Sequence, residues 1–453
     1  MRAFVSLECD GETWRLTAAC PDTEVFVADA GLPDTPSSRR AMGELLKYVE
    51  HAETIVTYGA DELTARLSDP VILPIARRCL QNVCDAQRAA LLVAAGLPGF
   101  SIETFCEMHH IEPPSVTDPS TFLERWETVA LRLRDRVNAL SDAAKGLISS
   151  VAGPTWSVAL LGPPGDPVSA GHALRALLPR RPRRGRMEPL PPPSDLAEVV
   201  GDVLSPDGPI SKEHDSYEHR PGQIEMAEAV AGALTRDEVL LVEAGTGTGK
   251  SLAYLIPAIV HARTQGKPVV VSTNTRNLQD QLIERDIPLA GRALGMEFRA
   301  AVVKGRSNYL CPRLMAAAAD RAAGSVFSDD RLALAHVIAW SSVVEIADIS
   351  SMSRMAVEMV ESIRPVVRQV QARSDSCSGR SCPYYQTCPV EVARAHAQNA
   401  DVIVANHALL LASSGTPILP EFEHVIIDEA HNLEDVATDQ LGREVTSIST
   451  RRL

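Results

Sequence analysis

The chain has 453 residues, enough for about three domains, and its 45% apolar and 23% charged residues are ordinary for a globular protein. The formal net charge of −14 disfavours binding of nucleic acid through bulk electrostatics, although it is compatible with a local basic track. The sequence has no signal-peptide pattern and no apolar run near the roughly 18 residues of a membrane span. We therefore expect a cytoplasmic protein with no membrane partner, whose nine cysteines are thiols or metal ligands.

The first region, residues 1–140, alternates strand-like and helix-like patterns. Apolar runs at 23–28 and 54–57 predict short buried strands. Apolar residues recur at helical spacing over 42–49, behind Ser38, which we expect to be the N-cap.

A longer helix is predicted from Asp118 onward. Asp118 is a typical N-cap, and Pro119 fits the first helical position. A stripe of apolar residues at helical spacing follows: Phe122, Trp126, Val129, Leu133 and Val137. We interpret this stripe as a face that packs into a core.

The order of these elements resembles the DnaQ-like exonuclease fold, a branch of the RNase H-like class. Residues 4–8, 55–61 and 84–86 stand where that family places its carboxylate motifs. Such enzymes hold two divalent metals with clustered carboxylates.

The carboxylate set is incomplete in this sequence. Ser6 occupies the first Asp position, and no His precedes a late Asp. We therefore expect a degenerate, non-catalytic exonuclease-fold domain over residues 1–140. A live 3′–5′ exonuclease that uses Glu8 and Asp61 is the alternative.

The second region, residues 141–215, is rich in Pro and Gly and carries a run of arginines before Pro191-Pro192-Pro193: Arg180, Arg181, Arg183, Arg184 and Arg186. Charged runs in Pro-rich segments are typical of solvated linkers. We predict a semi-rigid spacer here, with transient phosphate contact as the alternative.

The third region, residues 216–453, contains a phosphate-loop pattern. An apolar strand predicted over 238–242 runs into a glycine-rich loop and a helical stretch, which is the context that such a loop requires. Lys250 is expected to contact the β- and γ-phosphates, and the Ser251 hydroxyl is expected to bind Mg²⁺. Loop residues expected to bind ATP are Ala244, Gly245, Thr246, Gly247, Thr248, Gly249, Lys250 and Ser251.

A second motif follows the apolar run 424–427 and reads Asp428-Glu429-Ala430-His431. A carboxylate at the carboxyl end of a strand lies beside the phosphate loop in a doubly wound sheet. We expect Asp428 to coordinate Mg²⁺ through water and Glu429 to polarise the attacking water.

Four cysteines lie between these two motifs: Cys311, Cys377, Cys382 and Cys388. Four thiolates hold either Zn²⁺ or a 4Fe-4S cluster. One distant cysteine and a loosely spaced triplet favour the cluster over paired zinc ligands. The other five show no metal spacing and are expected to be packing residues: Cys9, Cys20, Cys79, Cys84 and Cys106.

Together these motifs resemble superfamily 2 helicases, which tolerate Ala at the position of Ala244. The cysteine spacing and the lead-in over 304–311 resemble the iron–sulfur insertion of the XPD/DinG family. The resemblance implies an α/β, RecA-like motor domain with a helical iron–sulfur insertion over about 305–395. It further implies that Gln223 recognises adenine and that His431, with Lys250, Asp428 and Glu429, forms the catalytic set.

The resemblance implies a monomeric 5′–3′ ATP-dependent DNA helicase that acts on single-stranded or duplex DNA in repair or replication. Residues 272–278 resemble motif Ia, and Asn406-His407 match a further family motif. We expect both to contact the phosphates of one strand, with an N-cap or a turn as the alternative for each. A local basic track is expected from Arg299, Lys304, Arg306 and Arg313.

The chain ends 22 residues after His431. The resemblance therefore implies that the second motor domain and its arginine finger are missing, so that the chain alone hydrolyses ATP poorly. We expect a fragment or a split gene. The alternative is a motor-dead iron–sulfur protein that binds DNA and regulates.

Overall fold

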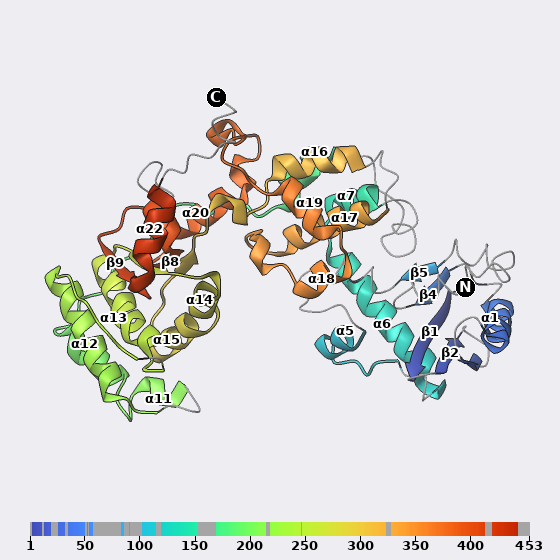
Figure 1. The fold of residues 1–453 in the computed structure, drawn as a ribbon, viewed down its shortest axis with the longest axis horizontal. Coiled ribbons are helices and arrows are strands. Elements are labelled where there is room, and N and C mark those ends of the chain that lie inside the picture. Colours follow the sequence, from blue (N-terminus) through green and yellow to red (C-terminus); the bar gives the residue numbers. More distant parts are fainter. Residues whose placement is uncertain are drawn as a thin grey trace. The chain divides into compact units, whose positions relative to one another are not determined.

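The computed structural model describes residues 2–10, 13–19, 26–31, 35–49, 52, 54–57, 83–85, 90, 102–114, 119–152, 169–213, 218–245, 247–322, 328–412 and 419–442. The chain forms two compact units, each built from two stretches of sequence (Figure 1). Unit 1 contains residues 1–179 and 309–387, and unit 2 contains residues 180–308 and 388–453. In the described residues, no helix has the length and apolar character needed to cross a membrane.

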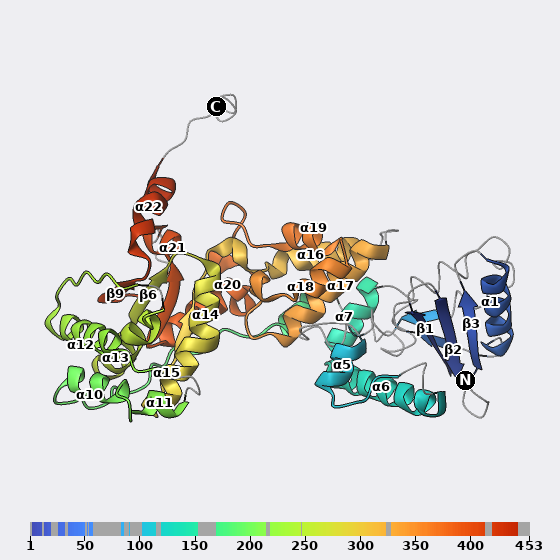
Figure 2. The ribbon, with the colours of Figure 1, turned by 60° about the horizontal axis from the view of Figure 1, so that its bottom comes forward.

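Unit 1 begins with a five-stranded mixed sheet (Figure 2). Its strands, in the order β3-β2-β1-β4-β5, are β3 (Phe26–Gly31), β2 (Thr13–Ala19), β1 (Arg2–Asp10), β4 (Thr54–Thr57) and β5 (Val83–Asp85). β1 pairs antiparallel with β2, whereas β4 pairs parallel with β1 and β5 parallel with β4. The predicted strand at 54–57 is confirmed.

Helix α1 (Pro36–Val49) lies beside β3 and buries Met42, Leu45 and Leu46. The helix is confirmed, but Ser38 is not its N-cap, because the helix already begins at Pro36. Proline suits a first helical position since its missing N–H would have no partner there.

Helices α5 (Ile102–Met108), α6 (Pro119–Ala139) and α7 (Asp142–Ala152) follow the sheet. The predicted start at Pro119 is confirmed. All five residues of the predicted stripe are buried in the core of unit 1, from Phe122 at 0% exposure to Val137 at 4%.

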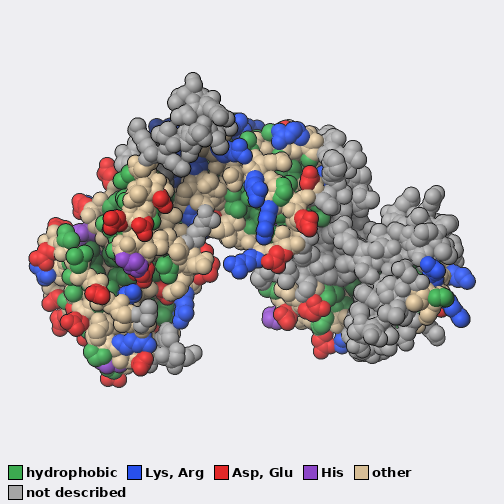
Figure 3. Space-filling model, in the orientation of Figure 1, with side chains coloured by type: hydrophobic (Ala, Val, Ile, Leu, Met, Phe, Trp, Pro, Cys, Tyr) green, Lys and Arg blue, Asp and Glu red, His purple; other side chains and the backbone are tan. Residues whose placement is uncertain are grey.

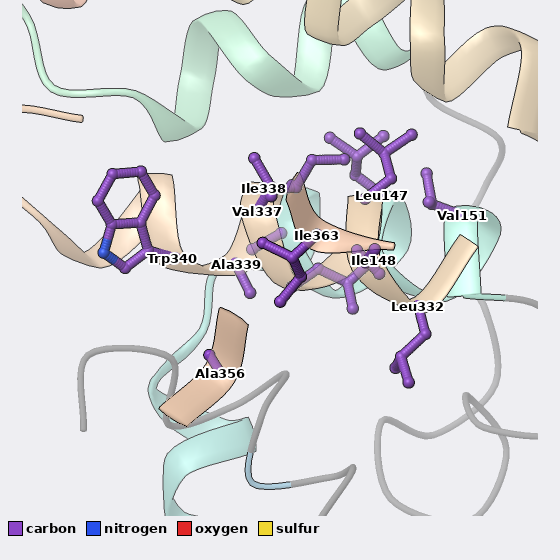
Figure 4. Packing of buried hydrophobic residues seen from close by; sticks show 14 of the residues in the cluster. Leu147, Ile148, Val151, Leu332, Val337, Ile338, Ala339, Trp340, Ala356 and Ile363 are labelled. Atoms are coloured by element: carbon purple, nitrogen blue, oxygen red, sulfur yellow. The ribbon is translucent and has the colours of Figure 1, made fainter. Parts of the chain in front are cut away.

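The second stretch of unit 1 is helical and shares its core with α7 and with α9 (Ala170–Leu177). Its helices are α16 (Pro312–Ala322), α17 (Ser328–Val343), α18 (Arg354–Met359) and α19 (Ile363–Val370). Leu147 and Ile148 of α7 lie among Ile338 and Ile363 (Figure 4). Arg331 Nε donates to the Val151 carbonyl at the end of α7 over 2.8 Å. Part of the predicted linker therefore packs in a helical core.

Unit 2 contains a parallel sheet with helices on both faces. The strands, in the order β7-β8-β6-β9, are β7 (Ala300–Val302), β8 (Val402–Asn406), β6 (Val269–Thr273) and β9 (His424–Ile427). Val271 packs with one apolar cluster and its neighbour Val270 with another, because successive strand residues point to opposite faces.

The helices of unit 2 divide between these two clusters. One cluster includes residues of α10 (Leu196–Val203), α12 (Pro221–Arg236), α13 (Lys250–Gln265) and α15 (Ile287–Leu294). The other includes residues of α20 (Pro389–Asn399) and α21 (His407–Ala412). The remaining helices are α11 (Pro209–Glu213), α14 (Arg276–Gln281) and α22 (Leu433–Leu441). Helices on both faces of a parallel sheet define an α/β domain.

Short turns of 3₁₀ or π helix complete the described elements: η2 (Leu282–Asp286), η3 (Arg306–Asn308), η4 (Ile349–Ser351), η5 (Gly379–Ser381), η6 (Tyr385–Thr387) and η7 (Ala430–Asn432).

Residues 180–190, here called the strap, belong to unit 2 and are hydrogen-bonded to its helices α13 and α20. The Asn399 side chain accepts from Gly185 N over 3.0 Å and donates to Arg183 O over 2.8 Å. Arg263 donates to Glu188 O over 3.1 Å and accepts from Leu190 N over 2.8 Å. The strap thus forms specific hydrogen bonds although most of its residues are exposed, and both the semi-rigid spacer and the domain boundaries stay predictions.

Candidate functional site

The phosphate-loop pattern lies immediately before α13. Gly247 and Gly249 have φ angles of 80° and 79°, a left-handed conformation that favours glycine. Gly249 is the residue from which α13 begins, so the amino end of a 16-residue helix follows the loop. Backbone N–H groups at such an end attract phosphate oxygens. Thr246 lies outside the described residues.

The prediction of a strand at 238–242 is wrong. These residues have no regular structure, and the side chains of Val239 and Leu241 are 96% and 91% exposed. A strand needs a neighbour for its N–H and C=O groups, and no described strand pairs with this segment. The loop keeps its helix but lacks the preceding strand.

Helix α12 holds the loop from one side. Gln223, only 5% exposed, donates from Nε2 to the Gly249 carbonyl over 2.9 Å. A Cβ added at Gly249 would lie 2.2 Å from Gln223 Nε2, so the Gln223 side chain would have to shift, and the positive φ separately favours glycine. Arg220 Nη1 donates to the Gly247 carbonyl. The Arg220 contact was not predicted, because nothing in the local sequence pairs an exposed arginine with a loop 27 residues away.

The second motif follows β9 directly. Lys250 Nζ donates to Glu429 Oε1 over 3.3 Å, so the loop lysine and the candidate catalytic carboxylate come together. Glu429 has a φ of 56°, a conformation uncommon for a side-chain-bearing residue. His431 Nδ1 lies 3.5 Å from Glu429 Oε2.

Asp428 is held by its backbone and by its side chain. Its N–H donates to the Ser272 carbonyl of β6 over 2.8 Å, and its Oδ2 accepts from the Tyr254 hydroxyl over 3.1 Å. Burial raises the pKa of Asp428, and the Tyr254 hydrogen bond opposes that effect. Tyr254 was not predicted as a site residue, because one Tyr in an apolar helix gives no sequence signal.

The donor set suits a hydrated Mg²⁺. Asp428 offers carboxylate oxygens and Ser251 a hydroxyl, and the Tyr254 hydroxyl donates to Asp428 Oδ2. Oxygen ligands of this kind, completed by water and phosphate, are what Mg²⁺ prefers. Ser251 and Asp428 would hold the ion, which would neutralise phosphate charge.

The residues expected to contact the phosphates of a DNA strand differ in burial and in hydrogen bonding. His407 is fully buried and bonds Ser272 Oγ through Nδ1 over 2.7 Å, so it cannot touch DNA directly. Asn406 Oδ1 accepts from Leu409 N over 2.8 Å, and Thr275 caps α14. For these two residues the structure shows the local hydrogen bond expected of a cap. Asn274 and Asn277 keep accessible side chains.

Cys311, Cys377 and Cys382 lie in unit 1, and Cys388 begins the second stretch of unit 2. Cys311 N donates to Val370 O over 2.7 Å, and Arg313 donates to Ser376 O over 2.8 Å, so the first cysteine lies beside the segment that leads to the triplet. In the described residues, no three His, Cys, Asp or Glu side chains form a group that could hold a metal ion.

The chemistry of these thiols still fits iron–sulfur ligation. Cys377 is exposed, and Cys311, Cys382 and Cys388 are partly exposed, with none in a disulfide. By contrast, burial raises the pKa of Cys106 to about 11. Cys106 is fully buried, which confirms it as a packing residue. Accessible thiols ionise and bind metal more readily than buried ones.

The expected basic track is largely engaged within the protein. Lys304 is 6% exposed and forms an ion pair with Asp280, and Arg299 donates to Gly185 O. On the face shown in Figure 3, Lys and Arg side chains gather over the helical part of unit 1. Arg364 and Arg368 of α19 are exposed.

The fold and the site define an α/β domain with a parallel sheet and a phosphate-loop pattern at the start of α13. Residues 220–315 match the DEAD/DEAH box helicase family, and residues 361–450 match the DEAD_2 family. These matches confirm the resemblance inferred from the motifs.

Curated relatives agree with this class. The chain is 37% identical over 262 residues to "ATP-dependent DNA helicase YoaA" of Haemophilus influenzae, covering 56% of this chain and 39% of the relative. It is 38% identical over 261 residues to YoaA of Escherichia coli, covering 56% and 38%. It is 39% identical over 245 residues to "ATP-dependent helicase DinG" of Mycobacterium tuberculosis, covering 50% and 36%. The matches thus span well under half the length of these relatives.

Proposed function

We propose that this chain provides the ATP-binding part of an ATP-dependent DNA helicase. The observation that carries the proposal is a pair of hydrogen bonds between α13 and the acidic motif. Lys250 Nζ donates to Glu429 Oε1 over 3.3 Å, and the Tyr254 hydroxyl donates to Asp428 Oδ2 over 3.1 Å. A phosphate loop and an acidic strand end joined in this way form a site for Mg²⁺ and a nucleoside triphosphate.

The proposed chemistry assigns each side chain one task. Lys250 binds the terminal phosphates, Asp428 and Ser251 hold the hydrated Mg²⁺, and Glu429 orients the attacking water. Lys250 and Glu429 form an ion pair with each other in the structure. A bound triphosphate would take Lys250 and free Glu429 for the water.

ATP turnover and ATP binding test this assignment separately. Glu429→Gln keeps the size of the side chain but not the charge, so it should bind Mg·ATP and lose hydrolysis. Lys250→Ala should lose binding as well. Arg40→Ala, on α1 of unit 1, is the control. Equal turnover in wild type and Glu429→Gln would remove Glu429 from the mechanism.

We also propose single-stranded DNA as the polymer substrate, with 5′–3′ movement in the complete helicase. The relatives' names support DNA. Asn274, in the turn after β6, and Asn277, in the first turn of α14, have accessible side chains and follow the carboxyl end of β6, as Asp428 follows that of β9. Polar side chains at such a turn bind phosphates without reading bases. His431 is proposed to couple the ATP state of the site to DNA binding. Gln223 is proposed to recognise adenine.

A 4Fe-4S cluster on Cys311, Cys377, Cys382 and Cys388 is proposed from the accessible thiols and the DEAD_2 match. The cluster would supply a rigid crosslink between segments distant in sequence.

For the amino-terminal sheet we propose an RNase H-like domain without catalysis, supported by its mixed strand order. Asp61 lies outside the described residues, and Glu8 lies in β1.

A further inference from the structure

Tyr254 carries a buried hydroxyl that the proposed chemistry does not use. It lies one turn beyond Ser251 on α13 and is 2% exposed. The hydroxyl donates to Asp428 Oδ2 over 3.1 Å. It therefore joins the helix that follows the phosphate loop to the acidic motif, 174 residues further along the chain.

Tyr254 belongs to the apolar cluster that also contains Ile259, Val271 and Val404. Burying a hydroxyl in such a cluster costs free energy unless it forms a hydrogen bond. A phenylalanine could supply the apolar ring, so we attribute the hydroxyl to its hydrogen bond with Asp428.

The Asp428 backbone is already fixed by its hydrogen bond to Ser272 O, at 2.8 Å. The carboxylate can still rotate about its side-chain torsions, and its orientation decides which oxygen faces the nucleotide. The Tyr254 hydrogen bond uses Oδ2, which leaves Oδ1 to point elsewhere. A carboxylate fixed before the metal arrives loses less conformational entropy on binding.

We propose that Tyr254 is a positioning residue that orients Asp428 for Mg²⁺ and thereby raises the affinity for the metal-bound nucleotide. This inference rests on the proposed function, since it takes Asp428 and Ser251 as the Mg²⁺ groups. A purely structural tyrosine would affect stability or nucleotide binding equally with and without Mg²⁺.

The test is the affinity of the full chain for fluorescent ADP, measured with Mg²⁺ and again with EDTA. Tyr254→Phe should weaken binding about tenfold with Mg²⁺, as expected for loss of a hydrogen bond to a charged group, and leave binding in EDTA within about twofold. Tyr309→Phe is a matched control, because Tyr309 is also 2% exposed but lies in unit 1. Thermal unfolding of each variant monitors packing.

A double-mutant cycle identifies the route of the effect. In an Asp428→Asn background, Tyr254→Phe should cause no further loss, because the two changes remove one interaction. Equal Mg²⁺-dependent affinity in wild type and Tyr254→Phe, or losses that add in the double variant, would overturn this inference alone. A wild-type chain that gains no affinity from Mg²⁺ would overturn the proposed function together with it.

Discussion

Glycine 249 shows how one residue fixes the geometry of the site. Its φ of 79° favours glycine, and a Cβ there would displace the Gln223 side chain from its hydrogen bond to the Gly249 carbonyl. The sequence predicted glycine here for approach to phosphate. The role of Gln223 as a brace for the same residue depended on a contact that no local pattern encodes.

Replacement of Gly249 by Ala should therefore impair the loop more than replacement of Gly247. Both have positive φ, costing on the order of 1–3 kcal/mol, but only Gly249 also meets Gln223, whereas a Cβ at Gly247 has open space. Nucleotide affinity of the two alanine variants checks the order. A larger loss of affinity at Gly247 than at Gly249 would contradict this prediction.

Gly146→Ala, on α7, where an added Cβ would have no neighbour within 4 Å, should stabilise the protein slightly.

His407 predicts a pH dependence of stability. Burial lowers the pKa of His407 below its ordinary value of 6.5, so the folded state binds a proton less readily than the unfolded chain does. The unfolded state then binds more protons as pH falls through about 6.5, and the free energy of unfolding decreases. His261 and His109 act in the same direction.

Unfolding by urea at pH 7.5 and at pH 5.5 measures this effect. His407→Asn, whose amide can still meet Ser272, should reduce the difference between the two pH values but not abolish it, because His261 and His109 remain. A variant with an unchanged pH difference would show that His407 is not held neutral.

Among the elements, those with strong local periodicity were predicted correctly. The stripe on α6 and the short strand β4 are found where the residues indicated. The segment 238–242 was not, because an apolar run becomes a strand only beside a partner. The hydrogen bonds of the strap to Arg263 and Asn399 were not predicted, because these residues lie far from it in sequence.

The strap should contribute measurably to the stability of unit 2. Asn399→Ala removes both side-chain hydrogen bonds to the strap and leaves Gly185 N and Arg183 O without this partner, at a cost of about 1–3 kcal/mol. Faster hydrogen exchange of the strap and of α20 would report the loss. The exposed pair Arg40–Glu44 provides the control, since its removal should change stability by less than about 0.5 kcal/mol. Equal exchange in both variants would contradict an ordered strap.

At the scale of the whole molecule, the chain crosses between its two units three times, the last between Thr387 and Cys388. The helices α7 and α9, from the region predicted to be a linker, complete the core around α17 and α19. Such pairings join distant segments, and composition alone predicts only that the segments between domains are polar and Pro-rich. The α/β motor fold was predictable because its loop and acidic motif fix a topology.

We propose that one chain joins an ATP site to a four-cysteine iron–sulfur site. Analysis of iron, zinc and acid-labile sulfide in the chain purified without oxygen tests it most directly. We predict about four iron and four sulfide per chain, lost in Cys377→Ser and kept in Cys106→Ala. Zinc without sulfide would contradict the claim and leave a P-loop ATPase domain with a structural zinc.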